Sequence, residues 1–210
     1  MVVRVHVTAF GAFEGVAANP TVDIIQRLVQ ENALQSKQAE TLDVDAKLCA
    51  AWCSKQTRDD DMPSVYIHLG VKQSATSPQI ELEACARNCA DFPVPDNANY
   101  QPTNERIDDA FENDAILRTR LDVDEMCKSL SAKGYQAKVS QDAGRYVCNY
   151  TYWHSLNACR TNPLHHALFI HVPDTNVMPV SDTTAAVCEV IALACASVEA
   201  KLPSCLCDRF

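Results

Sequence analysis

The hydrophobic positions of this chain alternate between short apolar runs and longer segments with helical spacing. Short runs at residues 2–8, 65–69, 136–140 and 167–172 predict β-strands. The run at 65–69 (VYIHL) is continuous rather than alternating, which is typical of a strand buried on both faces of a parallel sheet.

Helical periodicity appears between these runs. The segment that opens at Asn19 places four apolar residues on one face, namely Ile24, Ile25, Leu28 and Val29. Further helices are expected from a cap at Asp124 to about Gly134, over 145–159, and from a cap at Ser181 or Asp182 to about Leu202.

Strands that alternate with helices predict βαβ units. The expected fold is therefore α/β, a single-domain α/β/α sandwich over residues 1–210. Its sheet is expected to be mostly parallel and twisted, with helices on both faces. Residues 71–123 fit this rhythm poorly, because a Pro- and Asn-rich stretch (92–102) and a charged stretch (104–114) interrupt it.

Charge and apolar run lengths narrow the function classes. The chain has 18 basic and 27 acidic residues, a net charge of -9, which disfavours nucleic acid and anionic membranes as partners. No apolar run reaches roughly 18 residues, so no membrane-spanning helix is expected. The start of the chain does not resemble a signal peptide.

Cysteine usage points to a reducing compartment. Eleven cysteines, an odd number, in a chain of 210 residues fit reduced thiols in the cytosol better than a disulfide framework. Cys49/Cys53 and Cys85/Cys89 have helical spacing, and Cys205/Cys207 lie near the C-terminus. None of these pairs has the partners of a zinc site. Neither metal nor cofactor is expected.

Reactive side chains follow two of the predicted strands. Cys148 lies in the early turns of the helix after strand 136–140, where the positive end of the helix dipole favours a thiolate. His171 lies near the carboxyl end of strand 167–172. The two strands are expected to run parallel, side by side or nearby, so that one right-handed crossover brings both side chains to the same sheet edge, where they suit a nucleophile–base pair.

Spacing alone leaves alternatives open at each position. Cys148 and His171 are also compatible with plain core packing, and Glu81 and Glu83 are equal candidates to orient the imidazole. His165 and His166 precede the strand and are expected at the surface. Physical reasoning alone supports an α/β domain with a possible Cys–His hydrolase site.

Four separated segments carry a further observation. They are residues 8–15 (TAFGAFEG) with Asn19–Pro20, 83–88 (EACARN) with 95–97 (PDN) and 101–102 (QP), 140–149 (SQDAGRYVCN), and 169–173 (FIHVP). Together, and in this order, they resemble the motifs of pyroglutamyl-peptidase I, the C15 family of cysteine peptidases. The resemblance spans most of the chain.

The resemblance implies a catalytic triad of Cys148, His171 and Glu83, and it prefers Glu83 over Glu81. It also implies removal of an N-terminal pyroglutamyl (5-oxoproline) residue from peptides through a thioester. By the same resemblance, the lactam ring is held by a second set of residues: Phe10 and Phe13 sandwich it, Asn19 steadies their loop, and Tyr146 and Val147 line the pocket.

The sequence departs from the family pattern in places. Ala9 and Ala12 replace the usual Gly and Pro of the first loop, and Pro93 stands where many members carry an arginine near the oxyanion site. Two other functions stay open: a cysteine amidohydrolase of different acyl specificity, and a catalytically idle binding protein. No oligomeric state is expected from the resemblance.

Overall fold

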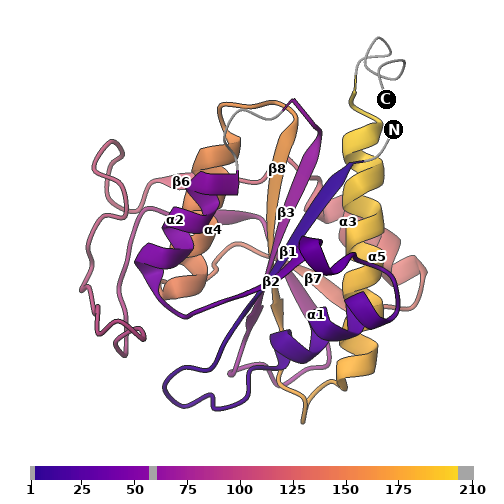
Figure 1. Ribbon diagram of the computed structural model, residues 1–210, viewed down its shortest axis with the longest axis horizontal. Coiled ribbons are helices and arrows are strands. Elements are labelled where there is room, and N and C mark those ends of the chain that lie inside the picture. The colour runs from indigo at the N-terminus through magenta and orange to yellow at the C-terminus, as the bar shows by residue number, and fades with distance from the viewer. Residues whose placement is uncertain (1–2, 57–60, 203–210) are drawn as a thin grey trace.

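A six-stranded sheet forms the centre of the computed structural model, which describes residues 3–56 and 61–202 (Figure 1). The strand order is β2-β1-β3-β8-β4-β7, and every neighbouring pair is parallel except β4 and β8. The strands are β1 (Arg4–Phe10), β2 (Ala39–Leu42), β3 (Ser64–Val71), β4 (Ile80–Glu83), β7 (Ala137–Ser140) and β8 (His165–Val172). The prediction of a mostly parallel sheet is confirmed.

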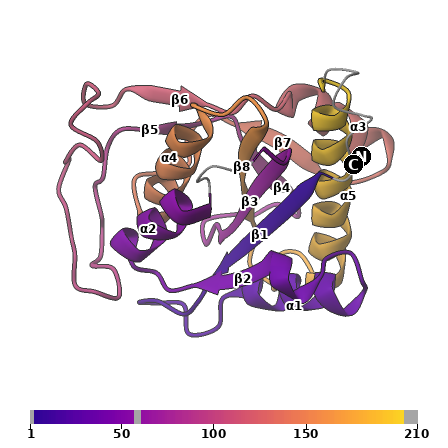
Figure 2. The same cartoon turned by 45° about the horizontal axis from the view of Figure 1, so that its top comes forward.

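Helices cover both faces of the sheet, so that three layers form (Figures 1 and 2). On one face lie α2 (Ala46–Gln56) and α4 (Val147–Cys159). On the other lie α1 (Pro20–Gln30), α3 (Val123–Ala132) and α5 (Val180–Glu199). A short 3-10 helix, η1 (Ser36–Gln38), precedes β2. The α/β class is confirmed.

Strand β3 shows why the apolar runs are continuous. Ile67 and Leu69 belong to the core beneath α1, α3 and α5, whereas Tyr66 belongs to the core beneath α2 and α4. Because successive side chains point to opposite faces, a central strand with helices on both sides needs apolar residues at nearly every position.

Helix starts differ from their predicted positions. The N-cap of α3 is Asp122, whose carboxylate accepts a hydrogen bond from the backbone N–H of Glu125 at 3.0 Å, rather than Asp124. Helix α5 begins at Val180 after Pro179 and has no side-chain cap, so Ser181 and Asp182 lie inside it. In both cases several polar residues cluster at the helix start, and their spacing alone does not select the cap.

The relation between β7 and β8 corrects a prediction about topology. Strand β4 lies between them, parallel to β7 and antiparallel to β8, so β7 and β8 run in opposite directions. A parallel crossover therefore does not deliver the α4 helix to the end of β8. The reason for the error is β4 itself (IELE, Ile80–Glu83), which is only four residues long and half acidic yet is buried at all four positions.

The irregular region forms a separate excursion beside α4. A two-stranded antiparallel sheet joins β5 (Cys85–Arg87) to β6 (Ile116–Arg118), and the chain between them extends past α2 and α4 (Figure 2). Fully buried Asn88 organises the excursion, because its side-chain amide donates to three backbone carbonyl groups of residues 108–112. Cys85 and Cys89 consequently do not share a helix, contrary to their spacing.

Helix α5 bears on the expectation about membrane spans. Among the residues that the structure describes, this one helix is long and apolar enough to cross a membrane by length and composition. The apolar residues of this helix are alanines, valines, Ile191 and Leu193, and polar residues such as Asp182 and Glu189 interrupt them, so the sequence shows no unbroken apolar run. Part of the helix, including Val187, Val190 and Ala194, packs into the core against the sheet.

Candidate active site

Cys148 is the second residue of α4. The helix starts after a tight turn at Gly144, which adopts a φ of +81°, and its N-cap Tyr146 provides no side-chain hydrogen bond to the first turn. The first backbone N–H groups of a helix have no partner within it, and they carry the positive end of its dipole. The Cys148 sulfur therefore lies where negative charge is stabilised.

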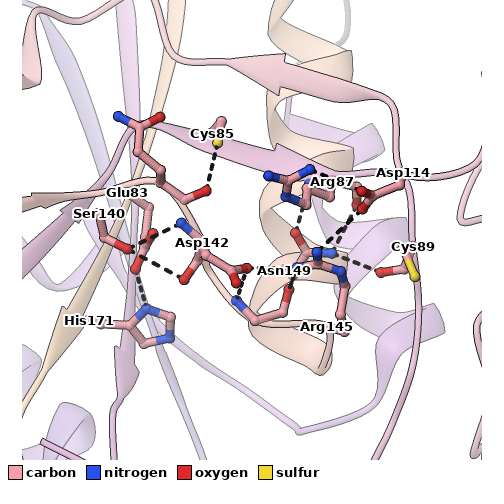
Figure 3. Close-up of polar contacts among 12 residues, drawn as sticks. Glu83, Cys85, Arg87, Cys89, Asp114, Ser140, Asp142, Arg145, Asn149 and His171 are labelled. Atoms are coloured by element: carbon pink, nitrogen blue, oxygen red, sulfur yellow. Dashed lines mark hydrogen bonds and ion pairs between the residues drawn. The ribbon is translucent and has the colours of Figure 1, made fainter.

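His171 and Glu83 form a buried pair (Figure 3). Nδ1 of His171 lies 2.7 Å from Oε1 of Glu83, and the two residues are 7% and 0% exposed. Burial by itself lowers the pKa of His171, but the contacts with Cys148 and Glu83 outweigh it and raise that pKa to about 10. The imidazole is thus held between the Cys148 sulfur and the Glu83 carboxylate, and these two neighbours favour its protonated form.

Glu81 lies beside this pair but has other partners. Its carboxylate accepts hydrogen bonds from the Lys72 amine at 2.6 Å and the Lys138 amine at 3.1 Å. Burial would raise the pKa of Glu81, yet the two ammonium groups hold it below its ordinary value. The geometry therefore distinguishes the two carboxylates, which the sequence spacing could not do: Glu83 pairs with His171, and Glu81 pairs with two lysines.

Pairing within the sheet brings these groups together. His171 in β8 is the register partner of Gly70 in β3 and of Glu81 in β4. Side chains two residues apart on a strand share a face, so Glu83 lies on the same face as Glu81 and His171. The loop before α4 then places Cys148 over Gly70, on that face.

A cleft of about 480 Å³ opens above Cys148 and His171. The structure brings all five residues implied for ring binding to this cleft, and they are Phe10, Phe13, Asn19, Tyr146 and Val147. They come from the end of β1, the loop after it, and the start of α4. Pro93 also lines the cleft, so the position that carries an arginine in many relatives offers no side-chain donor here.

The two phenylalanines differ in their surroundings. Phe10 is 3% exposed and stacks on Phe169 in the core, with 6.2 Å between ring centroids. Phe13 is only partly buried, and its ring centroid lies 5.9 Å from that of Tyr146. Phe10 therefore belongs to both the core and the cleft wall, whereas Phe13 belongs to the wall.

Asn19 connects the first loop to α1. Its amide donates to the backbone carbonyl of Gly11 at 3.2 Å, and its oxygen accepts from the hydroxyl of Thr21 at 2.8 Å. The Thr21 hydroxyl in turn contacts the backbone of Phe10. One buried asparagine thus caps the helix and fixes the loop that carries both phenylalanines.

Asn149 and Arg145 support the start of α4, a role that sequence reasoning missed. Buried Asn149 exchanges hydrogen bonds with the backbone of Arg87 and also donates to the carbonyl of Cys89, which ties the start of α4 to β5. Arg145 pairs with Asp142 and Asp114 (Figure 3). The signal for Asn149 was a polar residue directly after the nucleophile candidate, and the signal for Arg145 was a charged residue three positions before it.

Gly70 was also missed as a site residue. A Cβ atom at this position would lie 2.7 Å from Cζ of Phe169 and 3.0 Å from Sγ of Cys148. The φ of Gly70 does not lie in the left-handed region, so space alone requires glycine here. The absence of a side chain leaves the room that the Cys148 thiol occupies beside His171.

Gly70→Ala is therefore expected to displace the Cys148 thiol and to lower kcat/KM by about a hundredfold, since small displacements of reacting groups have large costs. Gly11→Ala is the matched control, because its added methyl group meets only the Leu42 carbonyl oxygen at an ordinary 3.6 Å. Steady-state kinetics on both variants tests this. Equal activity in Gly70→Ala and the wild type would contradict the steric account.

The other cysteines in the described part of the chain lie outside the cleft. None of the nine cysteines in the described residues, Cys148 included, forms a disulfide, and Cys205 and Cys207 lie outside that part of the chain. Burial raises the pKa of Cys49 and of Cys159 to about 12, which keeps these thiols protonated. Among the residues that the structure describes, no three His, Cys, Asp or Glu side chains cluster as metal ligands.

A thiol at a helix start, a histidine beside it and a carboxylate behind the histidine, on an α/β sheet, define the class of cysteine hydrolases. Comparison with known proteins narrows the class. A family model described as pyroglutamyl peptidase matches residues 3–201. This chain belongs to the pyroglutamyl peptidase family.

Individual relatives agree with the family model. The pyrrolidone-carboxylate peptidase of Thermococcus litoralis is 34% identical over 179 residues, which is 82% of this chain and 77% of the relative. That of Bacillus subtilis (strain 168) is 31% identical over 175 residues, or 81% and 78%. The solved structure of pyrrolidone carboxyl peptidase from T. litoralis aligns with a TM-score of 0.82 at 25% identity, covering 96% of this chain and 100% of that one.

Proposed function

We propose that this chain hydrolyses the amide bond after an N-terminal pyroglutamyl residue of peptides, with Cys148 as nucleophile, His171 as acid–base and Glu83 as its orienting carboxylate. The observation that carries the proposal is the contact of His171 with both Glu83 and Cys148 at the floor of a cleft with aromatic walls. Membership of the pyroglutamyl peptidase family supports the choice of substrate.

The reaction begins with a thiolate at Cys148. His171 carries the proton, and the Glu83 carboxylate stabilises the imidazolium and fixes which ring nitrogen faces the thiol. The sulfur attacks the carbonyl carbon of the pyroglutamyl residue, and its oxygen becomes negative. Backbone N–H groups at the uncapped start of α4, including that of Cys148, are the donors positioned to stabilise this oxyanion, because Pro93 offers none.

Breakdown of the intermediate releases the peptide. His171 donates its proton to the leaving nitrogen, the C–N bond breaks, and a thioester remains on Cys148. The neutral imidazole then takes a proton from water, which attacks the thioester and releases pyroglutamate. The thiolate–imidazolium pair is thereby restored for the next cycle.

The cleft explains the choice of acyl group. Pyroglutamate is a flat, neutral lactam with no free α-amine, so it suits aromatic walls and a few polar contacts rather than a carboxylate that binds an ammonium. Phe13 and Tyr146 provide the exposed aromatic surface, and Phe10 and Val147 provide the apolar base. Asn19 holds the loop in place from behind.

The test of function is turnover of a pyroglutamyl-coumarin amide beside an alanyl-coumarin amide. The proposal expects release of coumarin from the first substrate and none from the second. Cleavage of the alanyl substrate instead would favour a cysteine amidohydrolase of different acyl specificity. Tight binding of pyroglutamate without turnover would favour a catalytically idle binding protein.

The two phenylalanines separate ring binding from core packing. Phe13→Ala is expected to lower kcat/KM by roughly ten- to two-hundredfold while the melting temperature changes little, because a wall of the ring pocket is lost. Phe10→Ala is expected to lower kcat/KM and also stability, by about 3 to 5 kcal/mol, because a buried ring is removed. Both quantities are measured on the same preparations. An unchanged kcat/KM in Phe13→Ala would remove Phe13 from the pocket.

The partners and compartment follow the same proposal. The substrates are N-terminally pyroglutamylated peptides, and the described cysteines form no disulfide, which fits the reducing cytosol. The absence of nucleic-acid and membrane partners stays a prediction from the net charge of -9.

A further inference from the structure

A second, polar cavity adjoins the catalytic cleft on the side away from the aromatic walls. Its volume is about 150 Å³, and it shares Lys72 and Ser74 with the cleft. Glu81, Lys138 and Ser77 are among its other lining residues. Lys72 therefore lies at the boundary between the reacting groups and a polar recess.

The side chains around this recess carry a net positive charge. Two ammonium groups, those of Lys72 and Lys138, share the single carboxylate of Glu81. The side chain of Glu81 is 7% exposed, but those of Lys72 and Lys138 are 33% and 49% exposed. An ammonium group has three N–H donors, so each lysine retains donors that a further acceptor can use.

The sheet order places the recess on the side of the leaving group. Phe10 ends β1 at the aromatic wall, Gly70 in β3 lies beneath Cys148, and His171 in β8 is paired with Glu81 in β4. With the lactam at the aromatic wall and the scissile carbonyl at Cys148, the leaving nitrogen faces His171. The residue that follows pyroglutamate then extends toward Glu81 and Lys72.

We propose that Lys72, held by Glu81 and assisted by Lys138, forms the binding site for the leaving peptide and selects substrates with a carboxylate close behind the scissile bond. This inference rests on the proposed function and specifies its substrate class. The carboxylate has two possible sources: the terminal carboxylate of a pyroglutamyl dipeptide, or an acidic side chain in the residue after pyroglutamate. Glu81 limits the preference for substrates with this carboxylate, because its negative charge neutralises one of the two lysine charges.

The test measures kcat/KM for matched substrate pairs at low salt. Pyroglutamyl-alanine is compared with its amide, and pyroglutamyl-glutamate amide with pyroglutamyl-glutamine amide, so that each pair isolates one source of the carboxylate. The expected preference in at least one pair is roughly two- to fivefold, the range of a partly exposed ion pair. It should fade at 1 M salt, where screening acts within about 3 Å.

Substitutions in the recess test whether its residues cause the preference for a carboxylate. Lys72→Met should bring the ratio of kcat/KM values close to one, Lys72→Arg should retain it, and Glu81→Gln should increase it, because a neutralising charge is removed. Lys128→Met is the control, since Lys128 is an exposed residue of α3 whose amine pairs with Glu125. Ratios within one enzyme are insensitive to the amount of folded protein.

Two results would overturn the inference while the proposed function survives. One is a wild-type enzyme that cleaves all four substrates with ratios of one or less. The other is a Lys72→Met variant that keeps the wild-type ratio. By contrast, a wild-type enzyme that cleaves no pyroglutamyl substrate would refute both the proposed function and the inference that rests on it.

Discussion

Cys148→Ala is expected to abolish pyroglutamyl hydrolysis and to leave the fold intact. The variant lacks the sulfur that forms the thioester, and loss of a covalent nucleophile costs at least about 10⁴-fold in kcat. The fold should persist because Cys148 is only partly buried and lies at the margin of the core. Kinetics with the pyroglutamyl-coumarin amide and the melting temperature are the two measurements.

Cys188→Ala is the matched control for this variant. Cys188 is an exposed free cysteine on α5, across the sheet from the cleft, so its removal should leave activity near the wild-type level. Alkylation of the wild type should inactivate it by modifying Cys148, and a bound pyroglutamate analogue should slow the inactivation. Retention of more than a few per cent of activity in Cys148→Ala would contradict the assignment of Cys148 as the nucleophile.

His171→Ala is expected to have the second-largest effect, comparable with loss of the nucleophile. The imidazole serves both steps, and residues that act as a unit are not additive, so Cys148→Ala combined with His171→Ala should be no worse than either alone. Removal of the imidazole also leaves the buried Glu83 carboxylate without its partner, which destabilises the fold. His171→Asn keeps a donor near Glu83 and separates catalysis from stability.

Glu83→Gln provides the graded comparison. It keeps the shape of the side chain but removes the charge that stabilises the His171 imidazolium, so a smaller loss than in His171→Asn is expected. If Glu83→Gln were silent and His171→Asn inactive, the carboxylate would have no part in catalysis. If both histidine variants were active and well folded, the acid–base assignment would be wrong.

Apolar patterns predicted the strands that lie at the centre of the sheet. A strand covered on both sides is apolar at almost every position, as β3 is. Strand β8 is also covered on both sides, and its burial includes His165 and His166. Both histidines were expected at the surface but are 0% and 6% exposed within β8. Burial lowers the pKa of both imidazoles, which keeps them neutral and permits them in a core strand.

Short and polar elements escaped prediction. Strand β4 has too few residues for a pattern, and its two glutamates look exposed because their partners come from distant segments: His171 for Glu83, and the two lysines for Glu81. The direction of β7 relative to β8 depended on β4 and was therefore wrong as well. Pairings of this kind are set by tertiary contacts, which the spacing of residues along the chain does not encode.

The family resemblance predicted more of the candidate site than the spacing of residues along the chain did. Physical reasoning placed Cys148 at a helix start and His171 near a strand end, yet it left Glu81 and Glu83 equal. The structure distinguishes them by one hydrogen bond, which Nδ1 of His171 donates to the carboxylate of Glu83. The roles of Gly70 and Lys72 could not be predicted from the sequence, because they depend on which side chains approach these residues across the sheet.

The most direct test of the central claim is to trap the acyl-enzyme. Wild-type protein is mixed with a pyroglutamyl-coumarin amide, quenched in acid during turnover, and mapped by mass spectrometry of its peptides. The account predicts one added pyroglutamyl group, labile to hydroxylamine, on the peptide that contains Cys148. A pyroglutamyl group on another cysteine, or the same adduct level in Cys148→Ala, would contradict it.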